Sequence, residues 1–439
     1  MNYKNKKVLV YGLGSSGRSV IKLLQKIGAD VYVFDDDINE KEIPKNVTVV
    51  PCADFSDVAD LTILSPAISI DNPSIQKAVA KNKVTGELAF AADFLESEFI
   101  AVSGTNGKTT VTLMINDVLN GAGYESYALG NIGVPLSEKA LSLTPDDIAV
   151  VEVSSFQLET TKRLCPDIAV LTNVTSDHLD RHKTLDNYKN LKAKLFEGQC
   201  DREISVFNAD DETSEEISKI VKSDKFFFST KKRVRGAYLD GDEIVFEDEK
   251  RIHIANCGEL SACAGVNLEN VLATTATCMA RKINPEIIRM TLKSFAAPLY
   301  RTTYLGEKRG KKFYNDSKGT NISATLKSAE SMTGNTVLIL GGRGKGENFE
   351  DLFKKLPKNV IHAFITGENA REIMDGAIAA GFYNVTYRQS LKECFMESTV
   401  VRADNVLFSP ASSSLFTARR DIPRRSKAAT LFFTSKSRR

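Results

Sequence analysis

A glycine-rich segment with a lysine offers the clearest chemistry in this sequence. Residues 103–110 are Ser-Gly-Thr-Asn-Gly-Lys-Thr-Thr and lie between a predicted strand and a predicted helix. The backbone N–H groups of such a turn and the positive end of the helix dipole converge on one point, which favours phosphate groups. Lys108 would contact the β- and γ-phosphates of ATP, and the Thr109 hydroxyl would hold Mg²⁺. Val102 stands where the common Gly-x-x-x-x-Gly-Lys-Thr loop has its first glycine, so a glycine turn without a ligand is the alternative.

Two further segments follow apolar strands and carry side chains suited to metals. Glu152 ends the apolar run 148–152, and a P-loop needs a metal-supporting acid on a neighbouring strand, so we predict that Glu152 supports Mg²⁺ rather than being an ordinary surface acid. Residues 173–182, Asn-Val-Thr-Ser-Asp-His-Leu-Asp-Arg-His, include two of the four histidines. Loops at the carboxyl ends of parallel strands form the ligand crevice, so this loop suits metal and phosphate contacts. Two histidines with no third nearby do not indicate a zinc site.

A second glycine turn lies near the start of the chain. Gly12-x-Gly14-x-x-Gly17 follows a predicted strand and opens a helix, and Asp35 ends the next strand. This arrangement is typical of dinucleotide binding, in which a pyrophosphate meets the helix N-terminus and the acid meets a ribose. The pattern favours a nucleotide, of which NAD is one option, and a tight turn without a ligand is the alternative.

Polar segments late in the chain support weaker inferences. Residues 315–321 form a polar, glycine-bearing loop, a composition that more often makes an ordinary turn than a site. Residues 341–346 bring two cations to a turn after an apolar strand, which suits an anion, although a solvated turn explains them nearly as well. Residues 409–414 place hydroxyls after the last strand. The pattern of residues 188–196 predicts an amphipathic helix with a lysine-rich solvated face, and it gives no reason to single out Lys192.

Strands alternate with helical patterns throughout, which predicts an α/β fold with mostly parallel sheets. The predicted strands are 8–11, 31–34, 61–64, 99–102, 148–153, 168–171, 336–340, 361–366 and 405–408, and the predicted helices include 19–27 and 109–119. A hairpin is expected over 238–246, around Asp240-Gly241. A chain of 439 residues is too long for one ordinary core, and the grouping of its modules favours three domains.

Composition indicates a soluble protein. The apolar content of 42% and the charged content of 26% are those of globular proteins. No run approaches the roughly 20 apolar residues that span a bilayer, and the polar start lacks a signal-peptide core, so we predict a cytoplasmic location without a membrane span. The seven cysteines form no Cys-x-x-Cys pair, which argues against a disulfide framework and a zinc site.

The net charge of +2 is unevenly distributed, because the last 25 residues are strongly basic. Residues 415–439 include eight Lys or Arg and a single acid, Asp421. A basic tail can bind nucleic acid or a membrane surface. No upstream pattern supports either partner, so we predict neither.

In this order and at these distances, the motifs resemble the Mur ligase family from about Val8 to Ser414. The segments that carry the resemblance are Gly-Thr-Asn-Gly-Lys-Thr-Thr at 104–110, Gly-Asn-Ile-Gly at 130–133, Ser-Ser-Phe-Gln-Leu at 154–158, Asp-His-Leu-Asp-Arg-His at 177–182, Asn-Asp-Ser-Lys-Gly-Thr-Asn at 315–321 and Gly-Gly-Arg-Gly-Lys-Gly at 341–346. The resemblance implies a UDP-substrate-binding Rossmann-like domain (1–92), a central P-loop ATPase domain (93–297) and a Rossmann-like amino-acid-binding domain (298–439), the last with an atypical basic tail at 415–439.

The resemblance also implies an activity. It implies an ATP-dependent ligase that adds D-glutamate to UDP-N-acetylmuramoyl-L-alanine through an acyl phosphate, in peptidoglycan precursor synthesis, and so serves cell wall biogenesis, cell shape and cell division. It implies ATP, two Mg²⁺ ions with Mn²⁺ as a substitute, small-molecule partners and a monomer. The alternatives are another Mur-type or folylpolyglutamate-type amide ligase, or a catalytically impaired homologue. A nicotinamide dehydrogenase would leave residues 104–110 without a role.

The same resemblance implies roles for individual residues. The implied ATP contacts are Gly104, Thr105, Asn106, Gly107, Lys108, Thr109, Thr110, Asn267, Asn270, Arg301 and Asp316. The implied UDP-substrate contacts are Gly14, Ser15, Ser16, Asp35, Asn131, Ser154 and His178, and those of D-glutamate are Lys318, Thr320, Lys345 and Ser414. The implied metal ligands are Thr109, Glu152, His178 and a carbamylated Lys192, and the implied catalytic residues are Lys108, Glu152, His178 and Lys192.

Overall fold

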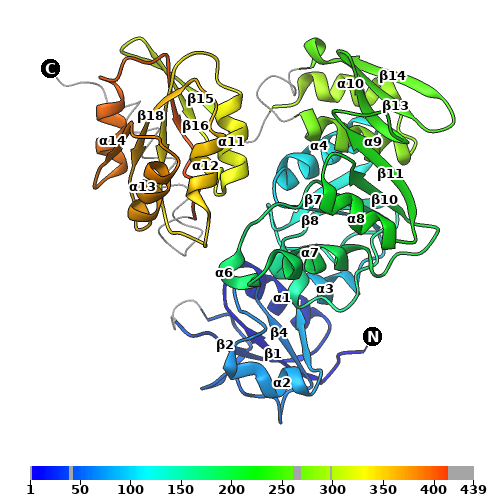
Figure 1. Cartoon of the computed structure of the whole chain (residues 1–439). Coiled ribbons are helices and arrows are strands. Elements are labelled where there is room, and N and C mark those ends of the chain that lie inside the picture. The colour runs from blue at the N-terminus through cyan, green and yellow to red at the C-terminus, as the bar shows by residue number, and fades with distance from the viewer. Residues whose placement is uncertain (1, 39–42, 261–267, 297–298, 414–439) are drawn as a thin grey trace. The chain divides into compact units, whose positions relative to one another are not determined.

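Short apolar strands and amphipathic helices alternate along the chain and assemble into three sheets (Figure 1). The computed structural model describes residues 2–38, 43–260, 268–296 and 299–413. Two predicted site residues, Asn267 and Ser414, and the basic tail 415–439 lie outside the described residues. The α/β class with mostly parallel sheets is confirmed.

The first sheet has five parallel strands in the order β3-β2-β1-β4-β5. They are β1 (Lys7–Tyr11), β2 (Asp30–Phe34), β3 (Thr48–Val49), β4 (Leu61–Leu64) and β5 (Val84–Gly86), with helices α1 (Ser15–Lys26), α2 (Gln76–Ala80) and α3 (Glu87–Ala92). The strand order reverses at β1, and such a reversal opens a crevice at the carboxyl ends of the strands. The predicted glycine turn follows β1 directly, at that crevice.

The second sheet has nine strands in the order β14-β13-β12-β11-β10-β9-β6-β8-β7. They are β6 (Glu98–Ser103), β7 (Glu125–Gly130), β8 (Asp147–Glu152), β9 (Ile168–Leu171), β10 (Ile204–Asn208), β11 (Asp224–Ser229), β12 (Gly236–Asp240), β13 (Glu243–Glu247) and β14 (Arg251–Asn256). Strands β7 to β12 pair in parallel, while β13 and β14 are antiparallel. The predicted hairpin is confirmed, since Asp240 pairs with Glu243.

Two apolar cores cover the faces of the second sheet. Helices α4 (Lys108–Gly121), α9 (Leu268–Ala280) and α10 (Pro285–Ser294) pack on one face through residues such as Met114, Leu272 and Ile288. The core on the other face includes Tyr188 of α7 (Leu185–Ala193) and Phe207, and it continues without interruption into α1 and α3 of the first sheet. The shared core joins the first two sheets. The remaining helices of this part are α5 (Ser155–Glu159) and α8 (Glu212–Ile220).

The third sheet has the order β15-β16-β20-β17-β18-β19 and is parallel except at its β15 edge. Its strands are β15 (Thr303–Lys308), β16 (Lys311–Asn315), β17 (Thr336–Leu340), β18 (Val360–Ile365), β19 (Val385–Tyr387) and β20 (Asn405–Phe408). Helices α11 (Ile322–Glu330), α12 (Phe349–Lys355) and α13 (Ala370–Ala379) pack on one face, and α14 (Leu391–Ser398) packs on the other (Figure 1).

The chain packs as two compact units. The described residues of 1–174 and 186–296 form the first, and residues 175–185, which contain α6 (Leu179–His182), join the described residues of 297–439 in the second. Among the described residues, no helix has both the length and the apolar character that crossing a bilayer requires. Two predicted helices begin earlier than expected, because α1 starts at Ser15 and α4 at Lys108, directly after their glycine turns.

Candidate active site

The predicted phosphate-binding loop connects β6 to α4. Two of its glycines have positive φ, +142° at Gly104 and +85° at Gly107, a region that side chains with a Cβ rarely adopt. A Cβ at Gly104 would lie 1.9 Å from the Thr172 hydroxyl, and one at Gly107 would lie 2.3 Å from the Asn270 side-chain oxygen. Both glycines are therefore required by conformation and by close packing. The Lys108 ammonium closes the loop by donating to the carbonyls of Gly104 (2.9 Å) and Thr105 (2.8 Å).

Polar side chains that follow β9, and one from α7, contact this loop. The Asn106 N–H donates to the Asn173 side-chain oxygen at 2.9 Å, and the Thr172 hydroxyl donates to the Asn106 carbonyl at 2.6 Å. The hydroxyls of Thr105 and Tyr188 lie 3.1 Å apart. Asn173 opens the segment 173–182 that was predicted to suit metal and phosphate contacts, but neither Asn173 nor Tyr188 was assigned an individual role. Asn173 lies just beyond the carboxyl end of the buried strand β9, as Glu152 lies at the end of β8.

Glu152 lies at the carboxyl end of β8, beside the start of α4. Its Oε2 accepts a 2.7 Å hydrogen bond from the Thr109 hydroxyl, and its Oε1 accepts one of 2.7 Å from the Asn131 amide. The Asn131 N–H also donates to the Glu152 carbonyl at 2.9 Å. The residue is only 2% exposed. Three predicted site residues from separate segments thus meet at one carboxylate.

This carboxylate and hydroxyl fit a magnesium ion. Mg²⁺ is usually held by one or two carboxylates together with waters and substrate phosphates, rather than by an all-protein cage. Glu152 and Thr109 supply such a partial set next to the phosphate-binding loop. The described part of the chain contains no group of three or more His, Cys, Asp or Glu side chains placed to enclose a metal.

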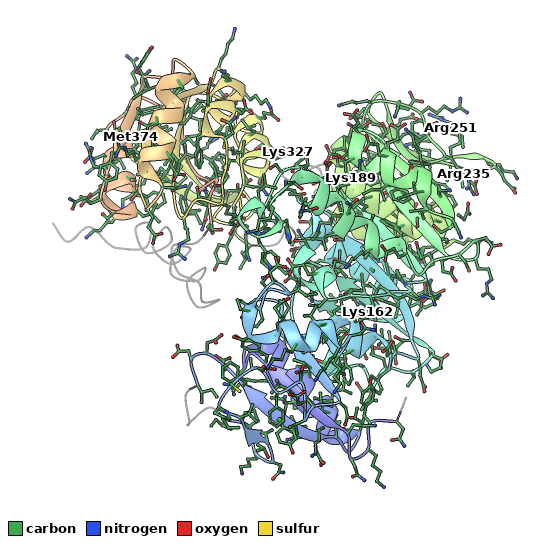
Figure 2. The ribbon with its side chains drawn as sticks, turned by 60° about the horizontal axis from the view of Figure 1, so that its bottom comes forward. Lys162, Lys189, Arg235, Arg251, Lys327 and Met374 are labelled. Atoms are coloured by element: carbon green, nitrogen blue, oxygen red, sulfur yellow. The ribbon has the colours of Figure 1, made fainter. Side chains whose placement is uncertain are left out.

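Lys192 contradicts the prediction of a solvated face on its helix. Its side chain is 1% exposed, and its ammonium donates to the Ser103 hydroxyl (3.1 Å) and the Gly104 carbonyl (2.9 Å). Lys189, on the same helix and labelled in Figure 2, instead forms a surface ion pair with Glu216. The α7 helix packs its Lys192 side against β6, so that lysine lies directly under the phosphate-binding loop.

The glycine turn after β1 is held by side chains of its own unit. A Cβ at Gly17 would lie 1.8 Å from the Gly12 carbonyl oxygen, so helix α1 can pack against the turn only through a glycine. The Asp35 carboxylate accepts hydrogen bonds from the N–H groups of Leu13 (2.5 Å) and Asp37 (3.0 Å). The acid therefore orients the turn. Gly14 and Ser15 are exposed at the start of α1, Ser16 is buried, and no Cβ contact crowds Gly14.

Ser154 begins helix α5 as its N-cap. Its hydroxyl accepts from the Gln157 N–H, while the Gln157 side-chain oxygen accepts from the Ser154 N–H at 2.8 Å. This capping box satisfies donors that the first helical turn leaves open. The Ser-Ser-Phe-Gln motif therefore has a local structural role at this position.

In the second unit, the loop 175–179 meets the turn that contains Lys345. The Lys345 ammonium is 3.1 Å from Asp177 Oδ1 and 3.2 Å from the Thr320 carbonyl, and its side chain is only 5% exposed. The Asn321 amide donates to Asp177 Oδ2 at 3.2 Å. His178, with φ of +53°, places its Nε2 3.8 Å from Asp177 Oδ2, an ion pair when the imidazole is protonated. The solvated turn considered for Lys345 is thus wrong.

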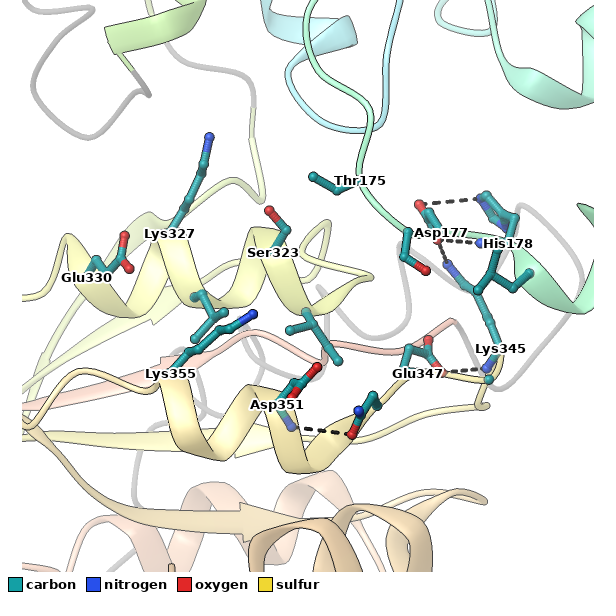
Figure 3. A pocket seen from close by; sticks show the side chains of 16 residues that line it. Thr175, Asp177, His178, Ser323, Lys327, Glu330, Lys345, Glu347, Asp351 and Lys355 are labelled. Atoms are coloured by element: carbon teal, nitrogen blue, oxygen red, sulfur yellow. Dashed lines mark hydrogen bonds and ion pairs between the residues drawn. The ribbon is translucent and has the colours of Figure 1, made fainter. Parts of the chain in front are cut away.

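A pocket of about 570 Å³ opens beside this ion pair, between α11 and α12 (Figure 3). Lys327 and Glu330 lie at one end, and Asp177 and Lys345 lie at the other. Burial raises the pKa of the Glu347 carboxyl in this pocket, although the Lys345 N–H donates to it at 2.5 Å. Both charge signs line the pocket, as suits a zwitterion.

Asp316 is almost fully buried at the end of β16. Burial raises the pKa of its carboxyl to about 6, against the opposing effect of hydrogen bonds from the hydroxyls of Ser409 and Ser328, both at 2.7 Å. The Thr302 N–H is a third donor, at 3.2 Å. The carboxylate thus ties together β16, α11 and β20. Beside it, Lys318 is exposed.

Two domain models of one family match the chain between residues 6 and 278. The Mur ligase middle domain matches residues 102–278, and the N-terminal domain of MurD-like Mur ligases matches residues 6–86. The chain therefore belongs to the Mur ligase family.

Relatives match it over nearly its whole length. The UDP-N-acetylmuramoylalanine–D-glutamate ligase of Alkaliphilus metalliredigens (strain QYMF) is 36% identical over 437 residues, which cover 94% of this chain and 95% of the relative. The ligase of the same name from Koribacter versatilis (strain Ellin345) is 36% identical over 430 residues, with 94% of each chain covered. The fold is also that of a pseudomurein peptide ligase type C from Methanothermus fervidus, with a TM-score of 0.62, 15% identity, and coverage of 98% of this chain and 99% of the other.

Proposed function

We propose that the protein is an ATP-dependent ligase that joins D-glutamate to UDP-N-acetylmuramoyl-L-alanine in peptidoglycan precursor synthesis. The observation that carries the proposal is the match, over 94% of the chain, to relatives of that name, in a chain whose Lys108, Thr109 and Glu152 meet at one phosphate-binding loop. The proposed setting is the cytoplasm, with a monomeric enzyme and small-molecule partners.

We assign one substrate to each of the three sheets and its helices. Residues 1–92 bind the UDP moiety through Gly14, Ser15, Ser16 and Asp35, and residues 93–297 are a P-loop domain that binds ATP. Residues 298–439 bind the amino acid. The open, exposed start of α1 supports the first assignment, because a helix N-terminus favours a diphosphate.

The proposed reaction has two steps. The substrate carboxylate attacks the γ-phosphorus of ATP, the bond to the β-phosphate oxygen breaks, and an acyl phosphate and ADP form. The amine of D-glutamate then attacks the acyl carbon, the C–O bond to phosphate breaks, and the amine proton leaves with solvent or phosphate. Lys108 and the N–H groups of 104–110 would hold the transferring phosphoryl group, where preorganised donors lower the barrier.

Metal binding is assigned to Thr109, Glu152, His178 and Lys192. A divalent ion supplies positive charge that offsets the charge spread over the phosphoryl oxygens, and two Mg²⁺ ions, replaceable by Mn²⁺, are proposed. Lys192 is buried next to the loop, and its conversion by CO₂ into a carbamate would replace a cation by a carboxylate-like ligand. Asn131 holds the Glu152 carboxylate and is also assigned to the UDP substrate, together with Ser154 and His178.

The remaining assignments concern ATP and D-glutamate. Asn270 contacts the loop at Gly107 and is assigned, with Asn267, to the adenine, while Arg301 and Asp316 are assigned to the nucleotide from the third sheet. The proposed D-glutamate ligands are Lys318, Thr320, Lys345 and Ser414. The buried ion pair of Lys345 with Asp177 supports a carboxylate site there, since a substrate carboxylate could take the place of the Asp177 carboxylate.

Phosphate release from ATP tests the proposal. The purified protein is incubated with ATP, Mg²⁺ and UDP-N-acetylmuramoyl-L-alanine against a panel of amino acids and folate substrates. We expect release that requires the UDP substrate and D-glutamate together. Release that ignores the UDP substrate, or that follows another amino acid, would remove the proposed specificity, and absence of release would indicate an impaired homologue.

A further inference from the structure

A buried carboxylate lies where helix α3 meets the second sheet. Glu87, the first residue of α3, is 1% exposed. Its Oε1 accepts hydrogen bonds from the Ser137 N–H (2.8 Å) and the Ser137 hydroxyl (2.5 Å). The Ser137 Oγ also lies 2.9 Å from the Oγ of Ser19 on α1. Burying a carboxyl group is costly unless it is hydrogen-bonded, so the bonds to Ser137, and through Ser137 the contact with Ser19, hold three segments in one arrangement.

Ser137 closes the segment that carries Asn131. The turn 130–134 is clamped to the end of β8, because the Asn131 N–H donates to the Glu152 carbonyl at 2.9 Å. Gly130, with φ of +93°, approaches so closely that a Cβ there would lie 2.5 Å from the same carbonyl. The Gly130 N–H donates to the Val134 carbonyl at 2.9 Å, and Ser137 follows three residues later. Few bonds are therefore free to rotate between Ser137 and Asn131.

The junction between β5 and α3 also contacts the segment that follows Glu152. A Cβ at Gly86 would lie 2.1 Å from the Thr160 hydroxyl oxygen, at the end of α5. Gly86 and Glu87 thus contact the chain on both sides of Glu152: the 130–137 segment through Ser137, and the 154–160 segment through Thr160.

We propose that Glu87 is a positioning residue for the ligase reaction. By holding Ser137 it fixes the turn whose Asn131 orients the Glu152 carboxylate toward Thr109, and through Ser19 it sets the position of α1, which follows the glycine turn of the first sheet. The Glu87 side chain therefore links two proposed sites of the first unit. One is the UDP-binding glycine turn before α1, and the other is Glu152, the proposed metal ligand beside the phosphate-binding loop. The inference rests on the proposed function for its substrates, but its geometry does not.

Replacement of Glu87 tests the coupling. In the E87A variant we expect the Mg²⁺ concentration for half-maximal retention of a fluorescent ATP analogue, and the KM for the UDP substrate, to rise about tenfold, as for loss of an outer-shell partner. The KM for D-glutamate should stay unchanged, because its proposed ligands belong to the second unit. E87Q should restore most of both values, since the amide oxygen still accepts from Ser137. Amide hydrogen exchange should accelerate more over residues 130–138 than in the strands of the second sheet.

A matched control lies one residue away. Lys22 of α1 and Glu138 form an exposed ion pair at 2.9 Å between α1 and the 130–138 segment. Exposed ion pairs contribute little to the stability of a folded protein. The E138Q variant should therefore behave as wild type in every assay. If E87A fails to fold, S137A, which removes the hydroxyl but keeps the N–H donor, should show smaller shifts in the same two constants.

The outcomes separate the inference from the proposed function. A wild-type protein that binds the ATP analogue but does not ligate D-glutamate contradicts the function and leaves the Mg²⁺ and exchange readouts to decide on Glu87. Variants that change only the melting temperature, that raise all three constants equally, or that match E138Q would overturn the positioning role.

Discussion

Replacement of Asp316 by Asn should change how the stability of the third sheet depends on pH. The carboxyl has a pKa of about 6 in the folded protein, against an ordinary value of 3.8, because burial disfavours its charged form. Between these two pKa values the folded state keeps a proton that the unfolded state has released. Stability therefore falls as pH rises through this window, and by about pH 7 the loss is complete.

The size of the effect follows from the shift. A difference of about 2 pKa units corresponds to about 3 kcal/mol, at 1.36 kcal/mol per unit. Asn cannot ionise, so the free energy of unfolding of D316N relative to wild type should increase by about 3 kcal/mol between pH 3 and pH 7, most of it between pH 4 and pH 6, and then level off. A constant offset from changed hydrogen bonds to Ser328 and Ser409 does not alter this slope.

Urea unfolding of the full-length protein, followed by pulsed hydrogen exchange, can measure this change in the free energy of unfolding. Peptides that cover β16, β17 and β20 report the third sheet separately, which matters because a chain of several units does not unfold in one step. D167N is the control: burial also raises the pKa of Asp167, but that residue belongs to the first unit, so the signal of the third sheet should not respond. A flat difference between pH 4 and pH 6, or one of opposite sign, would refute the reasoning.

Three further replacements test the phosphate-binding loop. K108A should reduce phosphate release by roughly 10²–10³-fold and abolish retention of ATP, because one preorganised donor is lost; retention equal to wild type would end its assignment. K192A should nearly abolish turnover, with partial rescue by short carboxylic acids, and unaltered turnover would exclude a carbamylated ligand. G107A should weaken ATP binding in a titration, since it adds about 1–2 kcal/mol of backbone strain and a clash with Asn270. G123A is the control: Gly123 has a similar φ of +89°, but a Cβ there would meet open space, so this variant should lower only stability.

The main features of the fold were predictable from local patterns. Strands such as 61–64, 168–171 and 405–408 match the structure residue for residue, because short apolar runs between turn residues form buried strands. The hairpin at Asp240-Gly241 was equally local. Strands β3, β5, β7, β10, β11, β14, β15, β16 and β19 were not predicted. The shortest of them, β3, β5 and β19, have too few residues to show a period that distinguishes them from a loop.

The candidate site was only partly predictable. Glu152 and Thr109 meet as expected, since a strand end and a helix start beside it have fixed relations in a parallel sheet. Lys192 was placed on a solvated face because its helix repeats lysines, yet β6 lies against that side and buries it. Asp35 was predicted to contact a ligand, and that prediction did not include the hydrogen bonds that its oxygens accept from the N–H groups of Leu13, in the glycine turn after β1, and of Asp37.

The sequence alone determined the glycine turns and the α/β class with mostly parallel sheets, because these depend on backbone conformation and on patterns within a few residues. Only the tertiary structure decided the surroundings of the charged groups. The burial of Lys192, the pairing of Lys345 with Asp177 and the contact of Glu87 with Ser137 each join residues at least 50 positions apart. The free energy of a charge is set by the groups that surround it in space, and no local pattern records which distant segment will supply them.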